Sequence, residues 1–351
     1  MSVLASPARV TNSVHPAGYS RLTMLRVYLD QNKWIDLARA ANGNPLGERF
    51  KTVGIVIAAA VEQGEASFPL SAGHFIETWK QRRARQRYEL ASTMATISRN
   101  HTIAPPHQLL PAELDHALQR RFGRSVTPLA VQPFGQGVEH VTGVHDGPPI
   151  PAAMRAAVLA TNPNLGEREL ANAIDQLLLA GPAQDMPIAG IPLPPMQPAH
   201  DFAAVQNEQV RLFIEHETDK GTRRRAVAAR ELWDMKEPLE AAMRRAGIWW
   251  EEIIALEAEG TTDLMLDLPS RAPGLELMWR QHDNTQTTWQ PNDMTDIGYL
   301  SAAVAYCDVV VTERKWAAML NQRGLASRFG TTVISDLTDL TEVLVTQSVA
   351  A

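Results

Sequence analysis

Both ends of this 351-residue chain carry short apolar segments rich in β-branched residues, each followed by a helical pattern. Near the N-terminus MLRVYLD ends on Asp30, and near the C-terminus DVVVT ends on Thr312. Short continuous apolar runs are typical of strands buried on both faces of a parallel sheet. Because strands and helices alternate at both ends, the sequence predicts one α/β parallel sheet assembled from the two chain ends.

The other elements of this sheet domain follow from apolar periodicity and from the positions of glycine and proline. Asp336 is a candidate N-cap of the last helix. Helices are predicted over 32–42, 46–62, 72–99, 291–307, 313–325 and 336–347, and further strands over 66–71 and 331–335.

The middle of the chain has a different character, with dense proline and mostly helical patterns. Pro238 is expected to kink or break the longest of these helices. We therefore predict an N-terminal arm at 1–23, a core domain in two parts at 24–100 and 290–351, and an insertion at 101–289 between them. Within the insertion, helices are predicted at 111–122, 151–160, 166–180, 203–218 and 222–258.

Composition excludes several classes of protein. The single cysteine, Cys307, excludes an internal disulfide framework and a CxxC metal site. No apolar run approaches the ~18 residues that a membrane-spanning helix needs, and the N-terminus lacks the apolar segment of a signal peptide. We therefore expect a cytoplasmic protein that does not contact a membrane. The sequence also lacks the P-loop, dinucleotide-binding, nucleophile-elbow and HExxH motifs.

The net charge of −6 argues against a protein that coats nucleic acid, but the charge is uneven. Between Thr78 and Arg124 there are nine Lys or Arg residues and three acids. Such a run is either a solvated helix face or a path for a polyanion.

Acidic residues are predicted to gather where the strands end, which is where open parallel sheets place functional groups. Asp30 follows the first strand, and Glu313 follows the apolar run DVVVT. Glu77 lies on the helix after the second strand, and Asp296 lies near the start of a C-terminal helix. Four acids at one edge would repel each other unless a cation lay between them, and their hard oxygen atoms favour Mg²⁺ or Mn²⁺.

The segments LDQNKWIDL, SAGHFIE and DIGYLSAAVAYCDVVVTERKW, in this order, resemble the motifs of PIN-like nuclease domains. The resemblance covers residues 24–100 and 290–345. It implies that Asp30, Glu77 and Asp296 bind a metal ion that supports phosphodiester hydrolysis.

The resemblance also implies that Thr312 closes the third strand and that Trp316 is the trailing aromatic residue of the motif. Where the family often places a fourth acid, two residues after Thr312, this chain has Arg314. Glu313, one position earlier, lies at the strand end and is the candidate fourth acid, whereas Asp308 begins the strand.

Each candidate residue also has a structural interpretation. Asp30 could form a turn or cap a helix, and Glu77 could be an exposed helix residue. We interpret Asp293 as the cap of its helix and Asp296 as the ligand, while the opposite assignment and a shared role stay open. Asn32 would hydrogen-bond a ligand acid or water, or cap a helix.

Other neighbours are candidate contacts to substrate. Ser71 is expected to cap the 72–99 helix and to orient the site, and His74 is interpreted as a hydrogen-bonded, partly buried residue. The Trp249–Trp250 pair could stack on bases, although a core role is preferred. Phosphates would meet basic side chains on the helix face of Glu77 and at the end of the third strand, namely Lys80, Arg83, Arg87 and Arg314.

Together these features predict a metal-dependent endoribonuclease acting on single-stranded RNA, in the role of a toxin or defence component silenced by an inhibitory protein partner. A homodimer is compatible with the family, although the sequence does not show one. The alternative is a catalytically inactive PIN-like scaffold that binds protein or RNA, which the presence of Arg314 favours.

Overall fold

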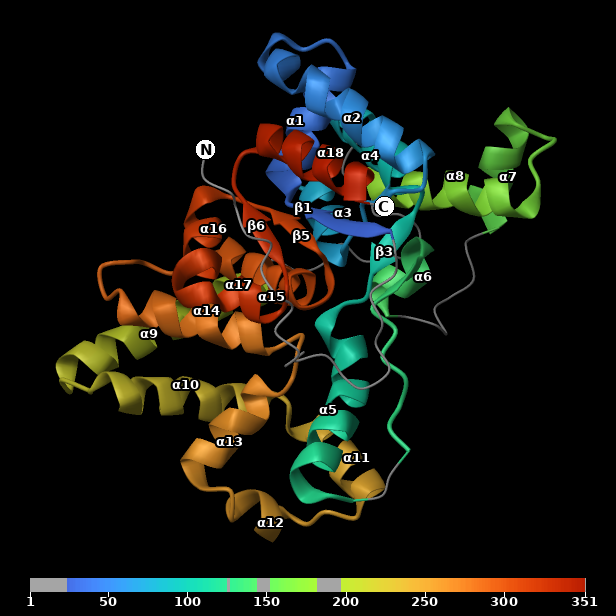
Figure 1. Ribbon diagram of the computed structural model, residues 1–351. Helices are drawn as coiled ribbons and strands as arrows, with labels where there is room; N and C mark the ends of the chain where they lie inside the picture. The colour runs from blue at the N-terminus through green and yellow to red at the C-terminus, as the bar shows by residue number, and fades with distance from the viewer. Residues whose placement is uncertain (1–23, 125–126, 144–151, 182–196, 351) are drawn as a thin grey trace.

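A computed structural model describes residues 24–124, 127–143, 152–181 and 197–350 (Figure 1). The predicted arm at 1–23 and most of the proline-rich segments at 148–151 and 182–198 lie outside the described residues.

The centre of the fold is a four-stranded parallel sheet with the strand order β2-β1-β5-β6. The strands are β1 (Leu25–Leu29), β2 (Ala66–Ser67), β5 (Val309–Val311) and β6 (Thr332–Ile334). The two middle strands come from opposite ends of the chain, with Tyr28 opposite Val310. The prediction of one parallel sheet assembled from both chain ends is therefore confirmed.

Helices cover both faces of the sheet because side chains of β1 and β5 alternate between two apolar clusters. Val27 and Val309 pack with the helices that lie above the sheet in Figure 1, whereas Tyr28 and Val310 pack with the helices below it. The upper helices are α1 (Gln31–Ala41), α2 (Lys51–Glu62), α4 (Ala84–Ser98) and α18 (Leu340–Ala350), and the lower ones are α14 (Ala272–Asp283), α15 (Pro291–Tyr306), α16 (Arg314–Asn321) and α17 (Leu325–Arg328).

The prediction of one helix over 72–99 is wrong, because the chain forms α3 (Ala72–Trp79) and α4 with a break between them. At the break, the buried guanidinium of Arg87 donates to the carbonyl oxygen of Gln81 at 2.7 Å. This side chain satisfies a carbonyl that a continuous helix would pair with a backbone N–H.

Two other expectations needed correction near the sheet. Of the predicted strand 66–71, only Ala66 and Ser67 pair with β1, and Leu70 forms a bridge with Thr102 instead. A short 3₁₀ helix, η1 (Pro45–Phe50), precedes α2, so the predicted helix 46–62 is two elements. Asp336 caps the 3₁₀ helix η4 (Leu337–Asp339) that leads into α18.

The insertion is mostly helical, as predicted, but it also contains an antiparallel strand pair that the sequence analysis missed, β3 (His101–Ile103) with β4 (Phe134–Gln136). The helices are α5 (Pro106–Phe122), α6 (Gly137–Thr142), α7 (Ala152–Thr161), α8 (Glu167–Ala180), α9 (Gln197–Glu215), α10 (Lys220–Asp234), α11 (Lys236–Ala246), α12 (Trp250–Ile254) and α13 (Glu257–Leu266). The predicted helix 222–258 is wrong as one element, because the chain forms α10, α11 and α12 there and begins α13, and the first break falls at Met235, ahead of Pro238.

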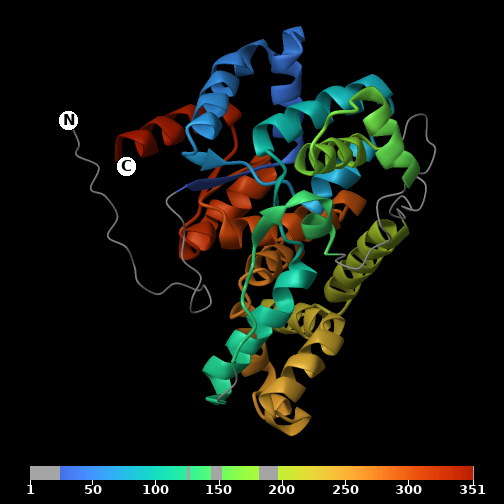
Figure 2. The same cartoon turned by 90° about the vertical axis from the view of Figure 1, so that its right-hand side faces the viewer.

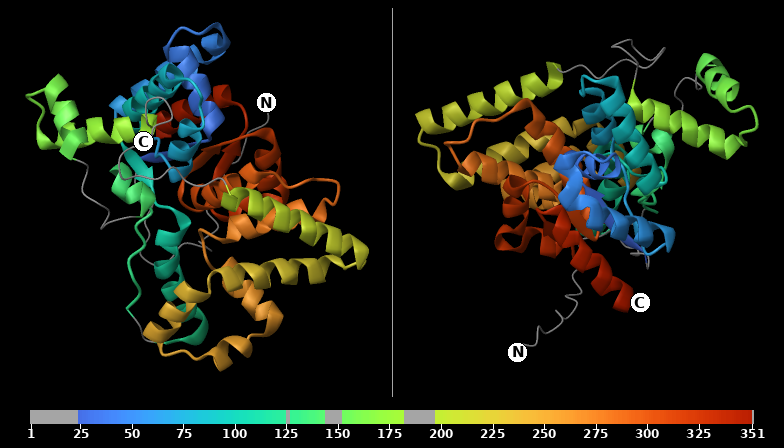
Figure 3. Two further views of the ribbon diagram at one scale, coloured as in Figure 1. Left: turned by 180° about the vertical axis from the view of Figure 1, so that it is seen from behind. Right: turned by 90° about the horizontal axis from the view of Figure 1, so that it is seen from above.

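The described parts of the insertion share apolar clusters with the sheet domain. Leu114 of α5 and Leu239 of α11 belong to the cluster that contains Val310, while Leu179 of α8 belongs to the other cluster. Helices α11–α13 lie at the end farthest from the sheet (Figures 1 and 2), and α7–α8 and α9–α10 extend to opposite sides (Figure 3). No helix of the described residues is long and apolar enough to span a membrane.

Candidate functional site

The strand order reverses between the neighbouring strands β1 and β5. From β1 the chain leads to its neighbour β2 on one side, and from β5 it leads to β6 on the other. Ligands of open α/β sheets bind at such switch points, outside the carboxyl ends of the strands. Asp30 directly follows β1, and Thr312 and Glu313 directly follow β5.

A cavity of about 200 Å³ lies at this edge, and all four predicted acids line it: Asp30, Glu77, Asp296 and Glu313. They come from four separate places, namely the end of β1, α3, the first turns of α15 and the start of α16. The structure therefore brings the four acids together as the sequence analysis expected.

Two hydrogen bonds hold the Asp30 side chain at the N-terminus of α1. Its Oδ1 accepts from the backbone N–H of Gln31 at 2.8 Å, which makes it the N-cap of the helix. Its Oδ2 accepts from the hydroxyl of the fully buried Thr312, also at 2.8 Å. Burial raises the pKa of the Asp30 carboxyl, and the nearby charge of Glu313 adds to this effect. Asp30 therefore both caps α1 and lines the cavity.

Asp296 has the most perturbed carboxyl group of the cavity. Burial is the main cause that raises its pKa to about 7, and the negative charges of Asp30, Glu313 and Glu77 add to it. One hydrogen bond opposes the shift, from the indole N–H of Trp316 to Oδ2 at 3.1 Å. The four acids therefore interact with one another electrostatically, which is the condition under which a cation is favoured.

Glu313 and Glu77 line the more exposed part of the cavity, and each is paired. The amide Nδ2 of Asn32 donates to Oε1 of Glu313 at 3.0 Å, so Asn32 hydrogen-bonds a candidate ligand acid. The ammonium of Lys80 contacts Oε1 of Glu77 at 2.5 Å and Oδ1 of Asn292 at 3.3 Å. Lys80 thereby links α3 to α15 across the rim.

The chemistry of the donors fits Mg²⁺ or Mn²⁺, since the cavity offers carboxylate and amide oxygens. The buried oxygens Oε1 of Gln31 and Oδ1 of Asn32 have no hydrogen-bond partner in the described structure. They are therefore available as further oxygen ligands for a cation. However, no group of three or more His, Cys, Asp or Glu side chains in the described residues is arranged to hold an ion. The carboxylates would have to turn toward one another on binding.

Asp293 takes the capping role. Its Oδ2 accepts from the backbone N–H of Gln290 at 2.8 Å and from Nε2 of Gln281 at 3.1 Å, and its Oδ1 pairs with Lys315 at 2.8 Å. It is buried and lies outside the residues that line the cavity. The observed contacts of Asp293 are therefore those of a helix cap, as the sequence predicted.

Ser71 and His74 are buried next to the cavity, and His74 is among the residues that line it. Ser71 precedes α3, and its backbone N–H donates to Nδ1 of His74 at 2.8 Å. Nε2 of the same ring donates to the carbonyl oxygen of Leu29 at 2.8 Å, which fixes a neutral tautomer. Burial lowers the pKa of His74 to about 4. The interpretation of His74 as a hydrogen-bonded residue is confirmed, and it is more buried than expected.

The prediction that Lys80, Arg83 and Arg87 share a helix face with Glu77 is wrong beyond Lys80. Because the chain turns between α3 and α4, Arg83 lies exposed before α4. Arg87 is buried, and its guanidinium donates to the carbonyl oxygens of Gln81 and Ala180. Arg314 is exposed in the first turn of α16.

The end of the basic run, Arg121 and Arg124, and the tryptophan pair are not among the residues that line the cavity. Arg121 pairs with Asp267 at 2.9 Å, and Arg124 pairs with Glu252 at 2.5 Å, so part of the run holds the insertion together. Trp249 is 74% exposed at α12, so the core role preferred for it is wrong, whereas the neighbouring Trp250 packs partly against the core. In Figures 1 and 2, α12 lies far from the sheet.

Gln31, Gly73 and Tyr299 also line the cavity, and they were not among the residues predicted from the sequence. Burial raises the pKa of Tyr299 to about 12. A Cβ atom added at Gly73 would lie 2.6 Å from the Tyr299 ring, so glycine is required there. The helical spacing of three residues between Asp296 and Tyr299 is a signal that could have found the tyrosine.

The Asp296 carboxyl should make the stability of the metal-free protein depend on pH. The folded state keeps this proton up to about pH 7, whereas its usual pKa is 3.8. The stabilisation is therefore complete below the unfolded pKa and is lost as the pH rises through 7. In the parent protein this loss should lower the free energy of unfolding by a few kcal/mol, on the order of magnitude that the pKa shift implies. We expect Asp296→Asn to abolish this dependence on pH. Thermal melts of both proteins in chelator at about pH 5 and about pH 8 would measure it; parallel curves would contradict it.

None of the protein-family models, curated proteins or solved structures compared with this chain matches it. The resemblance to PIN-like domains therefore rests on the motifs and on their placement around the sheet.

Proposed function

We propose that this protein is a metal-dependent nuclease with a PIN-like core, and that it hydrolyses phosphodiester bonds in single-stranded RNA at the cavity of Asp30, Glu77, Asp296 and Glu313. The observation that carries the proposal is the convergence of these four acids at the switch point of a parallel sheet. Four separate elements supply them.

The charges of the acids support a divalent ion as the cofactor. The carboxylates that line the cavity would hold it, namely those of Asp30, Glu77, Asp296 and Glu313. When bound, Mg²⁺ or Mn²⁺ would lower the pKa of a water molecule and offset charge on the phosphate. In the metal-free cavity the neighbouring acids help to raise the pKa of Asp296, and a bound cation would offset this repulsion.

The rim supplies contacts for a polynucleotide. Lys80 lies beside Glu77 and provides a cation at the mouth. The exposed residues Arg82 and Arg83 follow in the same loop, whose Gln81 lines the cavity. Contacts of this kind give salt-dependent affinity for phosphates. The roles of toxin or defence component, inhibitory partner and homodimer remain predictions of the sequence.

A second candidate function is a binding module without catalytic activity. Two observations favour it: Arg314 replaces the usual fourth acid, and the acids of the described residues are not arranged as ion ligands. Such a module would bind RNA or protein without cleaving RNA and without requiring a divalent ion.

Chelator-treated full-length protein separates the two functions. We expect calorimetry to detect Mn²⁺ binding, and a 5′-labelled single-stranded RNA to be cleaved only when Mn²⁺ or Mg²⁺ is added. Asp296→Asn should weaken both, whereas Asp263→Asn, at an exposed acid of α13, removes the same charge and should change neither. RNA binding without Mn²⁺ binding or cleavage would support the module instead.

A further inference from the structure

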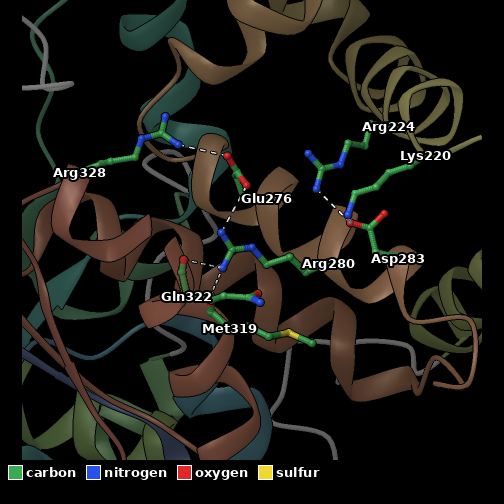
Figure 4. A network of polar contacts seen from close by, with 8 residues as sticks. All are labelled: Lys220, Arg224, Glu276, Arg280, Asp283, Met319, Gln322 and Arg328. Atoms are coloured by element: carbon green, nitrogen blue, oxygen red, sulfur yellow. Dashed lines mark hydrogen bonds and ion pairs between the residues drawn. The ribbon is translucent and has the colours of Figure 1, made fainter. Parts of the chain in front are cut away.

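A second and larger cavity, of about 710 Å³, lies between α10, α14 and the segment from α16 to α17. It shares no lining residue with the cavity of the four acids. Its volume lies in the range of pockets that hold small molecules, roughly 300–1,000 Å³. Figure 4 shows most of the residues that line it, although Arg323 is not drawn.

The lining of this cavity is strongly basic. Its cationic side chains are Lys220, Arg224, Arg280, Arg323 and Arg328. Only two carboxylates, Glu276 and Asp283, line it with them. Five positive and two negative groups leave an excess of three positive charges in a protein whose net charge is −6.

The two carboxylates are shared between four of these cations. Asp283 pairs with Lys220 at 2.7 Å and with Arg224 at 3.0 Å. Glu276 pairs with Arg328 at 3.1 Å, and it lies 3.6 Å from Arg280. Arg323 forms no ion pair with any residue that the structure describes. The carboxylates therefore position the cations without neutralising them (Figure 4).

The cations are held in place by the fold. The side chain of Arg280 is only 11% exposed, and its guanidinium donates to the carbonyl oxygens of Met319 and Gln322. Burial lowers the pKa of Arg280, and the charges of Arg323 and Arg224 act in the same direction. The buried Nε of Arg224 has no hydrogen-bond partner in the described structure. Such a donor is costly to leave unpaired.

We propose that this cavity binds a small molecule that carries two or more phosphate groups. Guanidinium groups match phosphate oxygens in geometry and charge, and four arginines converge here. A polyphosphate of two or more units would offset the three excess positive charges. A nucleic-acid strand is held along an extended groove, usually with exposed aromatic residues, whereas these cations surround a single cavity.

Binding can be tested with tripolyphosphate and ATP as probes, using full-length protein in chelator so that divalent ions do not contribute. We expect calorimetry to show saturable binding at one site that weakens as salt is added. Tighter binding of ATP would identify a nucleotide as the ligand class, and equal binding would identify the phosphate chain alone; both support the proposal.

Two variants assign the binding to the cavity. Arg323→Gln and Arg224→Gln should each weaken binding about tenfold or more, because each removes a charged hydrogen-bond donor. Arg244→Gln, at an exposed arginine of α11 outside the cavity, removes the same charge and should leave affinity unchanged. Melting curves would verify that each variant is folded.

Three results would overturn the proposal. They are the absence of binding by both probes, equal weakening by Arg244→Gln, and a site that binds a single-stranded oligonucleotide through Arg323 while it ignores tripolyphosphate. Because the assay needs neither a divalent ion nor cleavage, its outcome is independent of the proposed nuclease activity.

Discussion

Asp30→Asn is expected to reduce metal-dependent RNA cleavage by about a hundredfold to a thousandfold, which is the range found when one preorganised electrostatic contact is removed. The substitution takes one negative charge out of the cavity but leaves the side-chain shape. The new Oδ1 can still accept from the N–H of Gln31, and the new amide can donate to Thr312, whose hydroxyl both donates and accepts.

The same variant should be at least as stable as the parent protein. Burial disfavours the charged form of Asp30, and the charge of Glu313 adds to that cost, so an uncharged amide relieves both. A loss of activity together with an unchanged or higher melting temperature is typical of functional residues that are held at a cost in stability. Rates of RNA cleavage and thermal melts would be measured side by side.

Asp36→Asn provides the matched control. Asp36 lies on α1, which Asp30 caps, and it pairs with Arg39 on the surface, outside the cavity. Its substitution removes one negative charge, as Asp30→Asn does. Because surface ion pairs contribute little, we expect wild-type cleavage. If Asp30→Asn cleaved RNA at the wild-type rate, the assignment of the cavity as the active site would be wrong.

Glu113→Ala is expected to lower the free energy of unfolding by at least about 3 kcal/mol. The Glu113 carboxylate is fully buried on α5 and accepts from the Tyr306 hydroxyl at 2.5 Å and from the Ser270 hydroxyl and backbone N–H at 2.8 and 3.0 Å. The substitution leaves these three donors without a partner in an apolar core, and each unsatisfied buried group costs about 1–3 kcal/mol.

Urea unfolding of Glu113→Ala, with Glu113→Gln as the control that keeps one acceptor oxygen, would measure this effect. The network joins the insertion to α15, which also carries Asp296, so we expect a single transition shifted to lower urea. If the insertion instead unfolded in a separate transition and left the sheet domain intact, the predicted division at 101–289 would mark an independent domain.

Local signals predicted the parts of the site that lie at the ends of regular elements. Asp30 and Glu313 follow apolar runs whose length and β-branched content indicate buried parallel strands, and the edge at which such strands end is fixed by chain direction. Asp296 follows from the same reasoning, since its helix precedes β5. These positions depend on periodicity, which a sequence contains directly.

The errors arose where long-range contacts override local preference. The basic residues from Lys80 to Arg87 look like one helix, but a buried guanidinium pairs with backbone carbonyls, one of them on α8, and ends the helix pattern early. The same holds for the β3–β4 pair, whose three-residue strands are too short to show a period.

The sequence by itself therefore determined that one parallel sheet joins both ends of the chain and that four acids meet at its edge. Only the tertiary structure decided which basic side chains are free to meet a ligand. Arg121 and Arg124 form ion pairs with acids far away in the sequence. The second cavity likewise brings together Arg224, Arg280 and Arg323 from separate elements. Such juxtapositions depend on how helices pack, and helix packing is set by side-chain shape across elements and not by any local repeat.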